Sequence, residues 1–418
     1  MLRPVHLYEK IQLRNSLPFA SGCAKAPTGH IRHKRGRRIA GVKITGRNGT
    51  TLIQLDKLKT TGTLITTADA IGDTPAAQMS SPRDIGEARN WTRILNRYRE
   101  PDSARSMIEL AITFVPLALL WAAMWAAVHF VGYWLALLIA IPAAGFLVRL
   151  FMIQHDCGHG AFFSHKLLND WTGRIIGVLT MTPYDFWRRT HSMHHATHGN
   201  LDRRGIGDID TLTVREYLGL SRFDRIKYRL YRHPLVMFGI GPAYLFVLQH
   251  RLPVGMMRSG WVPWISTQAT NAAIALIAGT LIWFIGLKAF LLVHMPIILI
   301  AASLGVWLFY IQHQFEETSW HDGEQWDLHD AALHGSSHYD LPPVLRWFTA
   351  NIGIHHVHHL CSRIPYYRLP RVLRDHPELG DIGRLTLLDS LRCVRLTLWD
   401  EDNRRLVSFR QATSGAAA

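Results

Sequence analysis

Charged residues and cysteines are both scarce in this chain of 418 residues. Only 18% of the residues are charged, which is low for a soluble protein of this length. The four cysteines include no C-x-x-C pair, and disulfides are therefore not expected. A G-x-G-x-x-G turn between a strand and a helix is also missing, which argues against a bound dinucleotide.

Hydrophobic residues, in contrast, make up 48% of the chain and are gathered in blocks. A hydrocarbon layer of roughly 30 Å takes about 20 helical residues to cross. Four blocks have that length: 107–130, 133–153, 268–287 and 290–311. Val131-Gly132 joins the first two and Lys288-Ala289 joins the last two. The pattern predicts two tight transmembrane hairpins that turn on the same side of a membrane.

The distribution of Lys and Arg predicts which side that is, because positive loops mark the cytoplasmic face. Segment 155–267 carries 14 of these residues, the part after 312 carries 11, and residues 1–106 carry 19. The two hairpin turns together carry one, Lys288. Both termini and the middle loop are expected to be cytoplasmic. Anionic headgroups then account for much of the net charge of +15, and nucleic acid is not an expected partner.

The middle loop also contains a shorter apolar stretch, 235–248, broken by Gly-Pro. Its length predicts an interfacial or re-entrant segment that lies against the membrane. The alternative is a fifth span, which would put the two histidine-rich regions described below on opposite sides.

The first 78 residues are basic, with 13 Lys or Arg against four acids, and contain the patch "HIRHKRGRR". Three interpretations remain open: a targeting extension, although serine is scarce; a disordered basic arm; or a true start at Met79. The region 79–106 is expected to contain an amphipathic helix, with Ser81 as N-cap and Pro82 at the first helical position, that runs to about Arg99. It suits a helix on the membrane surface that ends before Pro101.

Histidines are unusually clustered. The three motifs are "HDCGHG", "THSMHHATH" and "NIGIHHVHHL", and their histidines are His155, His159, His191, His194, His195, His355, His358 and His359. The first motif follows the second span, the second lies in the middle loop, and the third follows the fourth span. The topology predicted from charge therefore brings all three to one face of the membrane.

The spacing predicts how these rings are used. An H-x-x-x-H pair places both rings on one helical face. In H-x-x-H-H we expect the first and fourth rings to share a face, and the fifth to reach a second metal. Imidazole suits iron, zinc, copper or nickel, and eight ligands exceed what one ion takes, so two ions are expected. A cysteine ligand, Cys157 or Cys361, is possible, but packing is the favoured role of both thiols.

In the order and spacing of these motifs the chain resembles the integral-membrane fatty acid desaturases, over about residues 100–400. The local sequence around the motifs is most similar to the Δ12/ω6 branch, in the segments "HDCGHGAFF", "THSMHHATHGN", "YIQHQFEETSW" and "NIGIHHVHHLCSRIPYYRL". The resemblance implies a non-haem diiron centre, with O₂ as co-substrate, that acts on a long acyl chain. It also implies a ninth ligand, His313. In some relatives an Asn one turn earlier reaches the iron through water, but Phe309 stands at that position here.

The resemblance implies the partners as well. The substrate would be an acyl lipid or acyl thioester, converted from oleoyl to linoleoyl. No "HPGG" motif of a fused cytochrome b5 is present, so electrons would come from a separate ferredoxin or cytochrome b5. A hydroxylase or ketolase on the same scaffold is the alternative. A membrane metal transporter is a more distant one, because its ligands would lie inside the spans.

Acidic residues near the motifs are expected to hold the ligating rings from behind, since an imidazole bound to metal usually donates its other N–H. The candidates are Asp156, Asp185, Asp208, Glu316 and Glu317, each of which has an arginine such as Arg188 or Arg189 as an alternative partner. Histidines outside the pattern are expected to have other roles: His165, His198, His321, His329, His334, His338 and His356. Of these, His198 comes closest to the pattern because it follows His194 by four.

The sequence thus predicts an all-α membrane protein, in which four transmembrane helices form two hairpins. A cytoplasmic helical cap would carry a dimetal site held by histidines, in a multi-pass protein of a bacterial inner membrane. We expect four parts: a basic extension 1–78, an amphipathic helix region 79–106, the membrane desaturase domain 107–400, and a flexible tail 401–418.

Overall fold

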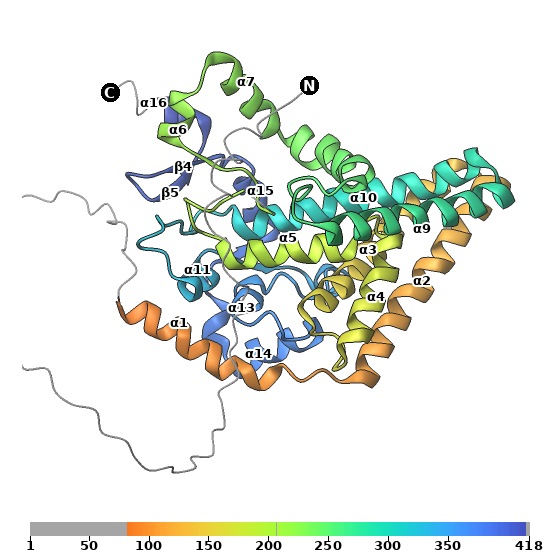
Figure 1. Ribbon diagram of the computed structural model, residues 1–418, viewed down its shortest axis with the longest axis horizontal. Helices are drawn as coiled ribbons and strands as arrows, with labels where there is room; N and C mark the ends of the chain where they lie inside the picture. The colour runs from red at the N-terminus through yellow and green to blue at the C-terminus, as the bar shows by residue number, and fades with distance from the viewer. Residues whose placement is uncertain (1–81, 206, 415–418) are drawn as a thin grey trace, which may run out of the picture. The chain divides into compact units, whose positions relative to one another are not determined.

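The computed structural model describes residues 82–205 and 207–414, and these form one compact unit (Figure 1). The basic extension and the predicted N-cap Ser81 lie outside the described residues. Most of the described chain is helical. This agrees with the predicted fold class.

Four of the helices are long and apolar enough to cross a membrane: α2 (Ser103–Phe130), α3 (Tyr133–His159), α9 (Trp261–Ile285) and α10 (Leu287–His313). They form two hairpins whose turns lie at the same end, on the right of Figure 1. The first turn is Val131-Gly132, as predicted. The second is Gly286, not Lys288-Ala289, because Gly286 takes a positive φ of 81° and Lys288 already lies in the first turn of α10.

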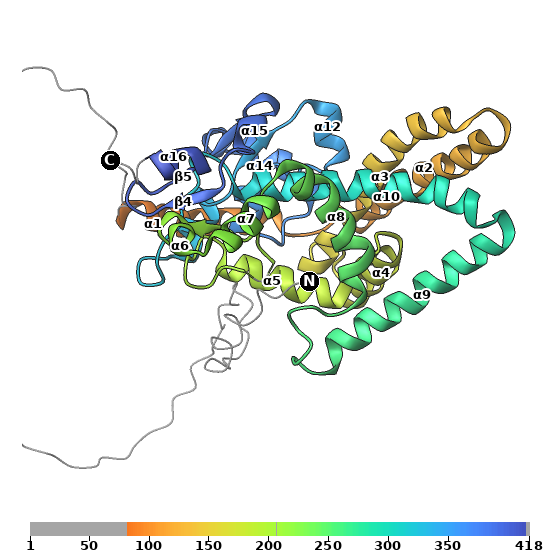
Figure 2. The same ribbon diagram turned by 90° about the horizontal axis from the view of Figure 1, so that it is seen from above.

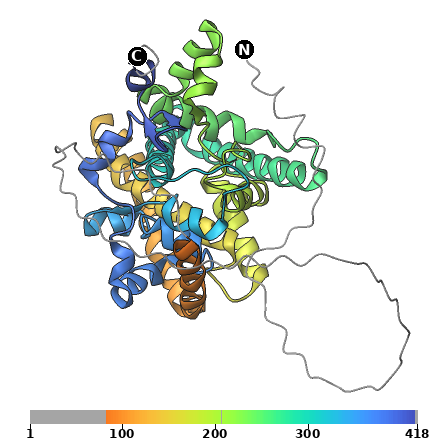
Figure 3. The ribbon, with the colours of Figure 1, turned by 90° about the vertical axis from the view of Figure 1, so that its left-hand side faces the viewer.

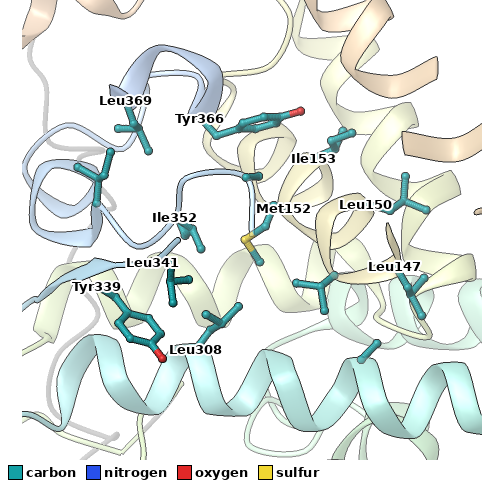
Figure 4. Packing of buried hydrophobic residues seen from close by; sticks show 14 of the residues in the cluster. Leu147, Leu150, Met152, Ile153, Leu308, Tyr339, Leu341, Ile352, Tyr366 and Leu369 are labelled. Carbon is teal, nitrogen blue, oxygen red and sulfur yellow. The ribbon is translucent and has the colours of Figure 1, made fainter. Parts of the chain in front are cut away.

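Small residues allow the spans to approach closely. Ala136, Ala140, Ala143 and Ala144 of α3 are all fully buried, and α3 packs against both α2 and α10. Figure 4 shows labelled side chains of α3, such as Leu147 and Met152, in the same packed core as Leu308 of α10 and residues of the C-terminal segments. Helix α9 differs, because its most apolar window has no buried residue. That surface is left for lipid.

Short helices form a cap at the other end of the spans, and Figure 3 looks onto it. Helices α4 to α7 follow α3, and six more follow α10. Their bounds are α4 Lys166–Leu179, α5 Tyr184–Thr197, α6 Val214–Gly219, α7 Arg222–Tyr231, α11 Leu328–His334, α12 Pro343–Phe348, α13 His355–Leu360, α14 Leu369–Asp375, α15 Leu387–Cys393 and α16 Phe409–Ser414. Single helical turns lie at η1 Asn96–Tyr98, η4 Gln249–Arg251, η5 Tyr366–Arg368 and η6 Pro377–Gly380.

Two small sheets brace the cap. Strand β4 (Leu398–Asp400) pairs in parallel with β1 (Leu212–Thr213) and antiparallel with β5 (Arg405–Val407). Strand β2 (His338–Asp340) pairs in parallel with β3 (Arg384–Thr386). Each strand has only two or three residues, too few for a period-2 pattern to be recognised in sequence.

Helix α1 (Pro82–Leu95) begins at Pro82 as predicted, but its apolar face does not lie on a membrane. Ala88, Trp91 and Leu95 are buried in the main core, and α1 contacts α11 and α13 of the cap. Arg89 also donates to Asp327 at the start of α11, at 2.8 Å. The helix is amphipathic as predicted, but its apolar face packs against the cap of the same protein.

The segment expected at the membrane interface forms an irregular helix of three parts: η2 (Val236–Ile240), α8 (Gly241–Ala243) and η3 (Tyr244–Leu248). It is not among the membrane-crossing helices found in the described residues. Ile240 and Leu248 are exposed on it, while Met237 packs into the core. The expected tail 401–418 is described as far as residue 414, where it forms β5 and α16 with Leu406 buried.

Candidate metal centre

The first histidine motif lies at the cap end of α3. The helix continues through the motif, so His155 and His159 project from one face, a turn apart. It ends at once after them, because Gly160 adopts a left-handed conformation with φ of 65°.

The second motif lies on α5, which is anchored to the end of α3. The hydroxyl of Tyr184, the first residue of α5, donates to the carbonyl oxygen of Cys157 at 2.9 Å. One turn later, the ring of Trp187 stacks on His191, with centroids 4.7 Å apart and planes at 14°. These contacts place His191, His194 and His195 against the first motif.

The third motif lies on α13, which begins with a sharp reversal of the chain. Ala350 and Asn351 have positive φ angles of 50° and 57°. Next, Gly353 approaches Tyr339 so closely that a Cβ at residue 353 would lie 2.3 Å from the Tyr339 carbonyl oxygen. Only glycine fits there, and the reversal directs His355, His358 and His359 toward α5 and α10.

The nine predicted histidines meet in two groups whose ligand atoms lie within 4.8 Å of one another. The five-histidine cluster draws on α3, α5 and α13, and consists of His155, His159, His191, His195 and His358. The four-histidine cluster draws on α5, α10 and α13, and consists of His194, His313, His355 and His359. The clusters adjoin, since the rings of His195 and His359 stack with centroids 4.0 Å apart.

The spacing between ring nitrogens fits metal ions. Neighbouring Nε2 atoms lie 3.0 to 3.2 Å apart in the five-histidine cluster and 3.1 Å apart in the other. Nitrogens about 2.1 Å from one ion lie about 3.0 Å apart at adjacent corners of an octahedron. Hydrogen bonds alone do not explain the pattern, because His191 Nε2 faces two other Nε2 atoms and carries at most one proton.

The distribution within each H-x-x-H-H motif differs from the prediction. The first and fifth histidines share a cluster, as His191 and His195 do, while the fourth, His194, joins the other cluster. On a helix the fifth residue is rotated by only about 40° from the first, whereas the fourth is rotated by about 60° to the other side. The expected pairing of first with fourth was therefore wrong, although two metal sites are still what the spacing produces.

Burial keeps these rings neutral. It lowers the pKa of the ring well below its usual value, and the neighbouring imidazoles lower it further, in His191, His195, His355, His358 and His359. A neutral imidazole presents a lone pair, which is the form that binds a metal.

Two of the five expected carboxylates lie behind ligating rings. Asp208 faces Nδ1 of His194, and both side chains are buried. Asp156 lies 3.4 Å from Nδ1 of His155 and also accepts a hydrogen bond from the backbone N–H of Tyr366 at 2.7 Å. Asp185 instead binds Arg174 and Arg188. Glu316 and Glu317 are exposed.

Among the remaining histidines, His198 lies nearest to the clusters. Its ring centroid is 4.1 Å from that of His313, and with His194 and Asp208 it forms a third group of possible ligands. Its Nε2 lies 2.6 Å from the Gly335 carbonyl oxygen, so one ring nitrogen is already engaged. His356 lies outside the clusters as expected, with Nε2 2.8 Å from the Leu379 carbonyl oxygen.

A metal transporter would need ligands deep in the spans. Here the candidate ligands in the spans all lie in the last turns at the cap end: His155, His159 and His313. His129 and His294, which lie elsewhere in the spans, belong to neither cluster. Cys157 and Cys361 are buried and also outside both clusters, as the packing role predicts.

A buried ion pair close to the five-histidine cluster was not predicted. Glu109 of α2 binds Arg149 of α3, and both side chains are 2% exposed. The Tyr366 hydroxyl donates to Glu109 at 3.0 Å, while the Tyr366 backbone holds Asp156. The only sequence signal was one charged residue inside each of the first two apolar blocks, which is unusual enough in a membrane to mark such a site.

With this geometry established, comparison with known proteins gives a clear result. The family model described as fatty acid desaturase matches residues 132–386, which include all nine histidines. This chain belongs to that family. The desaturase is an oxidoreductase, and its four spans make it an integral membrane protein.

Several curated relatives are similar to this desaturase. A fatty acid desaturase of Bacillus subtilis is 44% identical over 323 residues, covering 77% of this chain and 91% of the relative. An sn-1 acyl-lipid omega-3 desaturase (ferredoxin) of Synechocystis sp. is 30% identical over 56% of this chain and 66% of its own length. An acyl-lipid omega-3 desaturase (cytochrome b5) of Arabidopsis thaliana is 28% identical over 53% and 58%.

Proposed function

We propose that this desaturase inserts a second double bond into a monounsaturated acyl chain of a membrane lipid, converting oleoyl to linoleoyl at the Δ12/ω6 position. The observation that carries the proposal is the pair of adjoining histidine clusters at the cap ends of four spans. An acyl chain has no acidic proton at mid-chain. An oxidising metal centre is therefore required.

The residues that would hold two iron ions are the nine histidines: five around one ion and four around the other. When bound, reduced diiron supplies the O₂ activation that removes hydrogen from an unactivated methylene. The chain's own residues orient the ligands. Asp208 keeps a proton on Nδ1 of His194, which leaves Nε2 for the metal, and Asp156 does the same for His155.

A separate protein would supply the electrons. The names of two relatives specify ferredoxin and cytochrome b5 as donors, and both names describe acyl-lipid substrates. The cap, which carries the clusters and most of the basic loops, would face the cytoplasm, where a soluble carrier docks. For this chain we propose an acyl lipid in a bacterial inner membrane as the substrate.

The position of the new bond is the finest part of the proposal. The Δ12/ω6 assignment rests on the local sequence around the histidine motifs, whereas the plant and cyanobacterial relatives above are both named omega-3 desaturases. An ω3 bond is therefore the second candidate. Placement of the chain against the irons decides between them, because a shift of about one ångström changes which methylene reacts.

The test is expression in a host that makes only monounsaturated fatty acids, followed by mass spectrometry of its lipids with localisation of the double bonds. We expect a diene that has lost two hydrogens, with the new bond at Δ12. A diene with the bond elsewhere would refute the regiochemistry alone. A hydroxy acid, which has gained one oxygen, would refute desaturation and support the hydroxylase alternative on the same scaffold.

A further inference from the structure

A cavity of about 420 Å³ opens on the cap beside the histidine clusters. Its walls are the loop 201–204, the start of α6, the segment 320–325 and the β4–β5 hairpin. Figure 1 shows α6, β4 and β5 together, at the end of the described unit away from the hairpin turns. Arg215 and Asp322 are exposed in its lining, so the cavity is accessible from outside the membrane.

Trp320 separates this cavity from the metal centre. It is buried, and it lines both this cavity and a much smaller space of about 10 Å³ beside His198 and His313. Its ring centroid lies 6.1 Å from that of His198, whose ring lies 4.1 Å from that of His313. Two aromatic rings therefore connect the cavity to a residue of the four-histidine cluster.

Both rings are held in place. His198 is fixed by its Nε2 contact with Gly335, and its backbone carbonyl oxygen accepts a hydrogen bond from Trp326 Nε1 at 2.9 Å. Trp320 packs with Trp399 and Leu406 in a small core of its own. The indole N–H of Trp320, however, has no acceptor among the described residues, although it is buried. Such groups are rare, and this one lines a cavity where a ligand could supply the acceptor.

We propose that a soluble one-electron carrier protein docks at this cavity, and that Trp320 and His198 carry the electronic coupling from its redox group to His313. This rests on the proposed function, because desaturation consumes two electrons. One O₂ combines with the two hydrogens removed from the acyl chain, two protons and two electrons, and the products are two molecules of water and the unsaturated chain. Each carrier molecule is oxidised by one electron and the metal centre is reduced by one. The two rings themselves are neither oxidised nor reduced.

The rim carries charges of both signs, because Asp202, Glu216, Asp322 and Glu401 line the cavity beside Arg204, Arg215 and Arg404. Arg204 is paired with Glu216, whereas the side chain of Arg215 is 69% exposed and is the cation best placed to meet a carboxylate of the carrier. Arg215 pairs with the equally exposed Asp402, and such a surface pair is weak enough to exchange partners.

The experiment measures the oxidation of pre-reduced carrier by the iron-loaded full chain, without acyl substrate, using ferredoxin and cytochrome b5 in separate stopped-flow runs. Dithionite, a small reductant that needs no docking site, serves as the comparison. We expect Trp320→Leu to slow oxidation of the carrier about tenfold or more. A tenfold slower rate corresponds to an activation free energy about 1.4 kcal/mol higher. Its iron content and its reduction by dithionite should match the wild type.

Two matched variants separate this role from packing. Trp320→Phe keeps an aromatic ring at the contact with His198, and we expect it to retain a rate near that of the wild type. Trp399→Leu removes an indole from the same core and the same cavity, but Trp399 has no ring contact with a histidine among the described residues, so its rate should also be retained. Arg215→Glu should raise the carrier concentration needed for half-maximal rate, and less so at high salt.

The route would be overturned if the wild type and Trp320→Leu oxidised the carrier equally fast, or if Trp399→Leu were slowed as much as Trp320→Leu. A normal carrier dependence of Arg215→Glu would overturn the docking site. If instead the iron-loaded wild type accepted electrons from dithionite but from neither carrier, the proposed donors would be wrong. A wild type that no reductant reduces would refute the proposed function itself.

Discussion

The imidazole of His194 is held from both sides. Its Nδ1 faces the Asp208 carboxylate, and its Nε2 lies 3.1 Å from that of His313 in the four-histidine cluster. A carboxylate behind a ligand fixes the tautomer and raises the basicity of the ring. We therefore propose that Asp208 acts on a metal bound by His194 through the imidazole, without being a ligand itself.

Asp208→Asn keeps the shape of that contact but removes its charge. We expect the affinity for iron to fall by about 10- to 100-fold, as measured by iron retained per chain during competition with a chelator. Asp185→Asn is the control, since Asp185 lies on the same helix as His194 but binds Arg174 and Arg188. Equal iron retention in the two variants would contradict a role for Asp208 in holding the metal.

His358 is a more severe test, because it belongs to the five-histidine cluster and lies on α13 with two ligands of the other cluster. His358→Ala should lose iron and desaturase activity together, while the exposed His165→Ala should keep both. Metal analysis and lipid product analysis of the same preparations give the answer. An active His358→Ala enzyme with full iron content would remove His358 from the site.

Sequence spacing was sufficient to predict that eight histidines gather, because motif order, helix ends and span topology all restrict the same residues. The ninth, His313, was expected only from the resemblance to the desaturases. Spacing was not sufficient to divide the histidines correctly, since the difference between the fourth and fifth positions of a motif depends on which neighbouring helix each ring faces. The role of His198 was also beyond reach. Its contacts with His313 and Gly335 cross more than 100 residues of sequence.

At the scale of the elements, the α2–α3 hairpin is joined by the buried pair of Glu109 and Arg149. Arg149 also donates to the Trp347 carbonyl oxygen after the second hairpin, and Tyr366 links Glu109 to the segment that follows α13. The spans and the cap therefore share one polar network. Its position beside Asp156 ties the packing of α2 to the five-histidine cluster.

Removing one charge of this pair should be far more damaging than removing both. Glu109→Gln leaves the Arg149 charge buried without its partner, and we expect a loss of about 3–5 kcal/mol of unfolding free energy. The double variant Glu109→Leu/Arg149→Leu removes both charges and should lose less. Thermal unfolding of the purified protein in detergent compares them. A double variant less stable than Glu109→Gln would show that the pair itself, not the lone charge, dominates.

Hydropathy predicts well those elements whose surroundings are uniformly apolar, and the ends of the four spans were predicted to within about seven residues. Elements whose apolar face has a specific partner were harder to predict. The face of α1 was assigned to a membrane, but it covers α11 and α13. The strands were missed because β1 finds its partner β4 almost two hundred residues away. The residues of a two-residue strand do not indicate which distant segment it pairs with.

At the scale of the whole molecule, both hairpin turns lie on one side of the spans and both H-x-x-H-H motifs on the other. Figure 2 shows the same separation from above. The five-span alternative is thereby excluded, since it would separate motifs that meet in one centre.

Cysteine labelling in inverted and right-side-out vesicles tests the orientation. Ser164→Cys and Val344→Cys place exposed thiols on the cap, while Val131→Cys places one in the first hairpin turn. We expect an impermeant reagent to label the two cap positions only from the cytoplasmic side, and Val131→Cys only from the opposite side. The reverse pattern would invert the orientation, and labelling of the two cap positions from different sides would break the topology.

The central claim is that two iron ions lie side by side between the histidine clusters. Its most direct test is the iron content of purified, catalytically active protein, combined with Mössbauer spectroscopy of an iron-57 preparation. The account predicts about two irons per chain, one for each cluster, with the magnetic coupling of a diiron pair, and activity that chelation removes and iron restores. Full activity with one iron per chain, or with zinc alone, would contradict it.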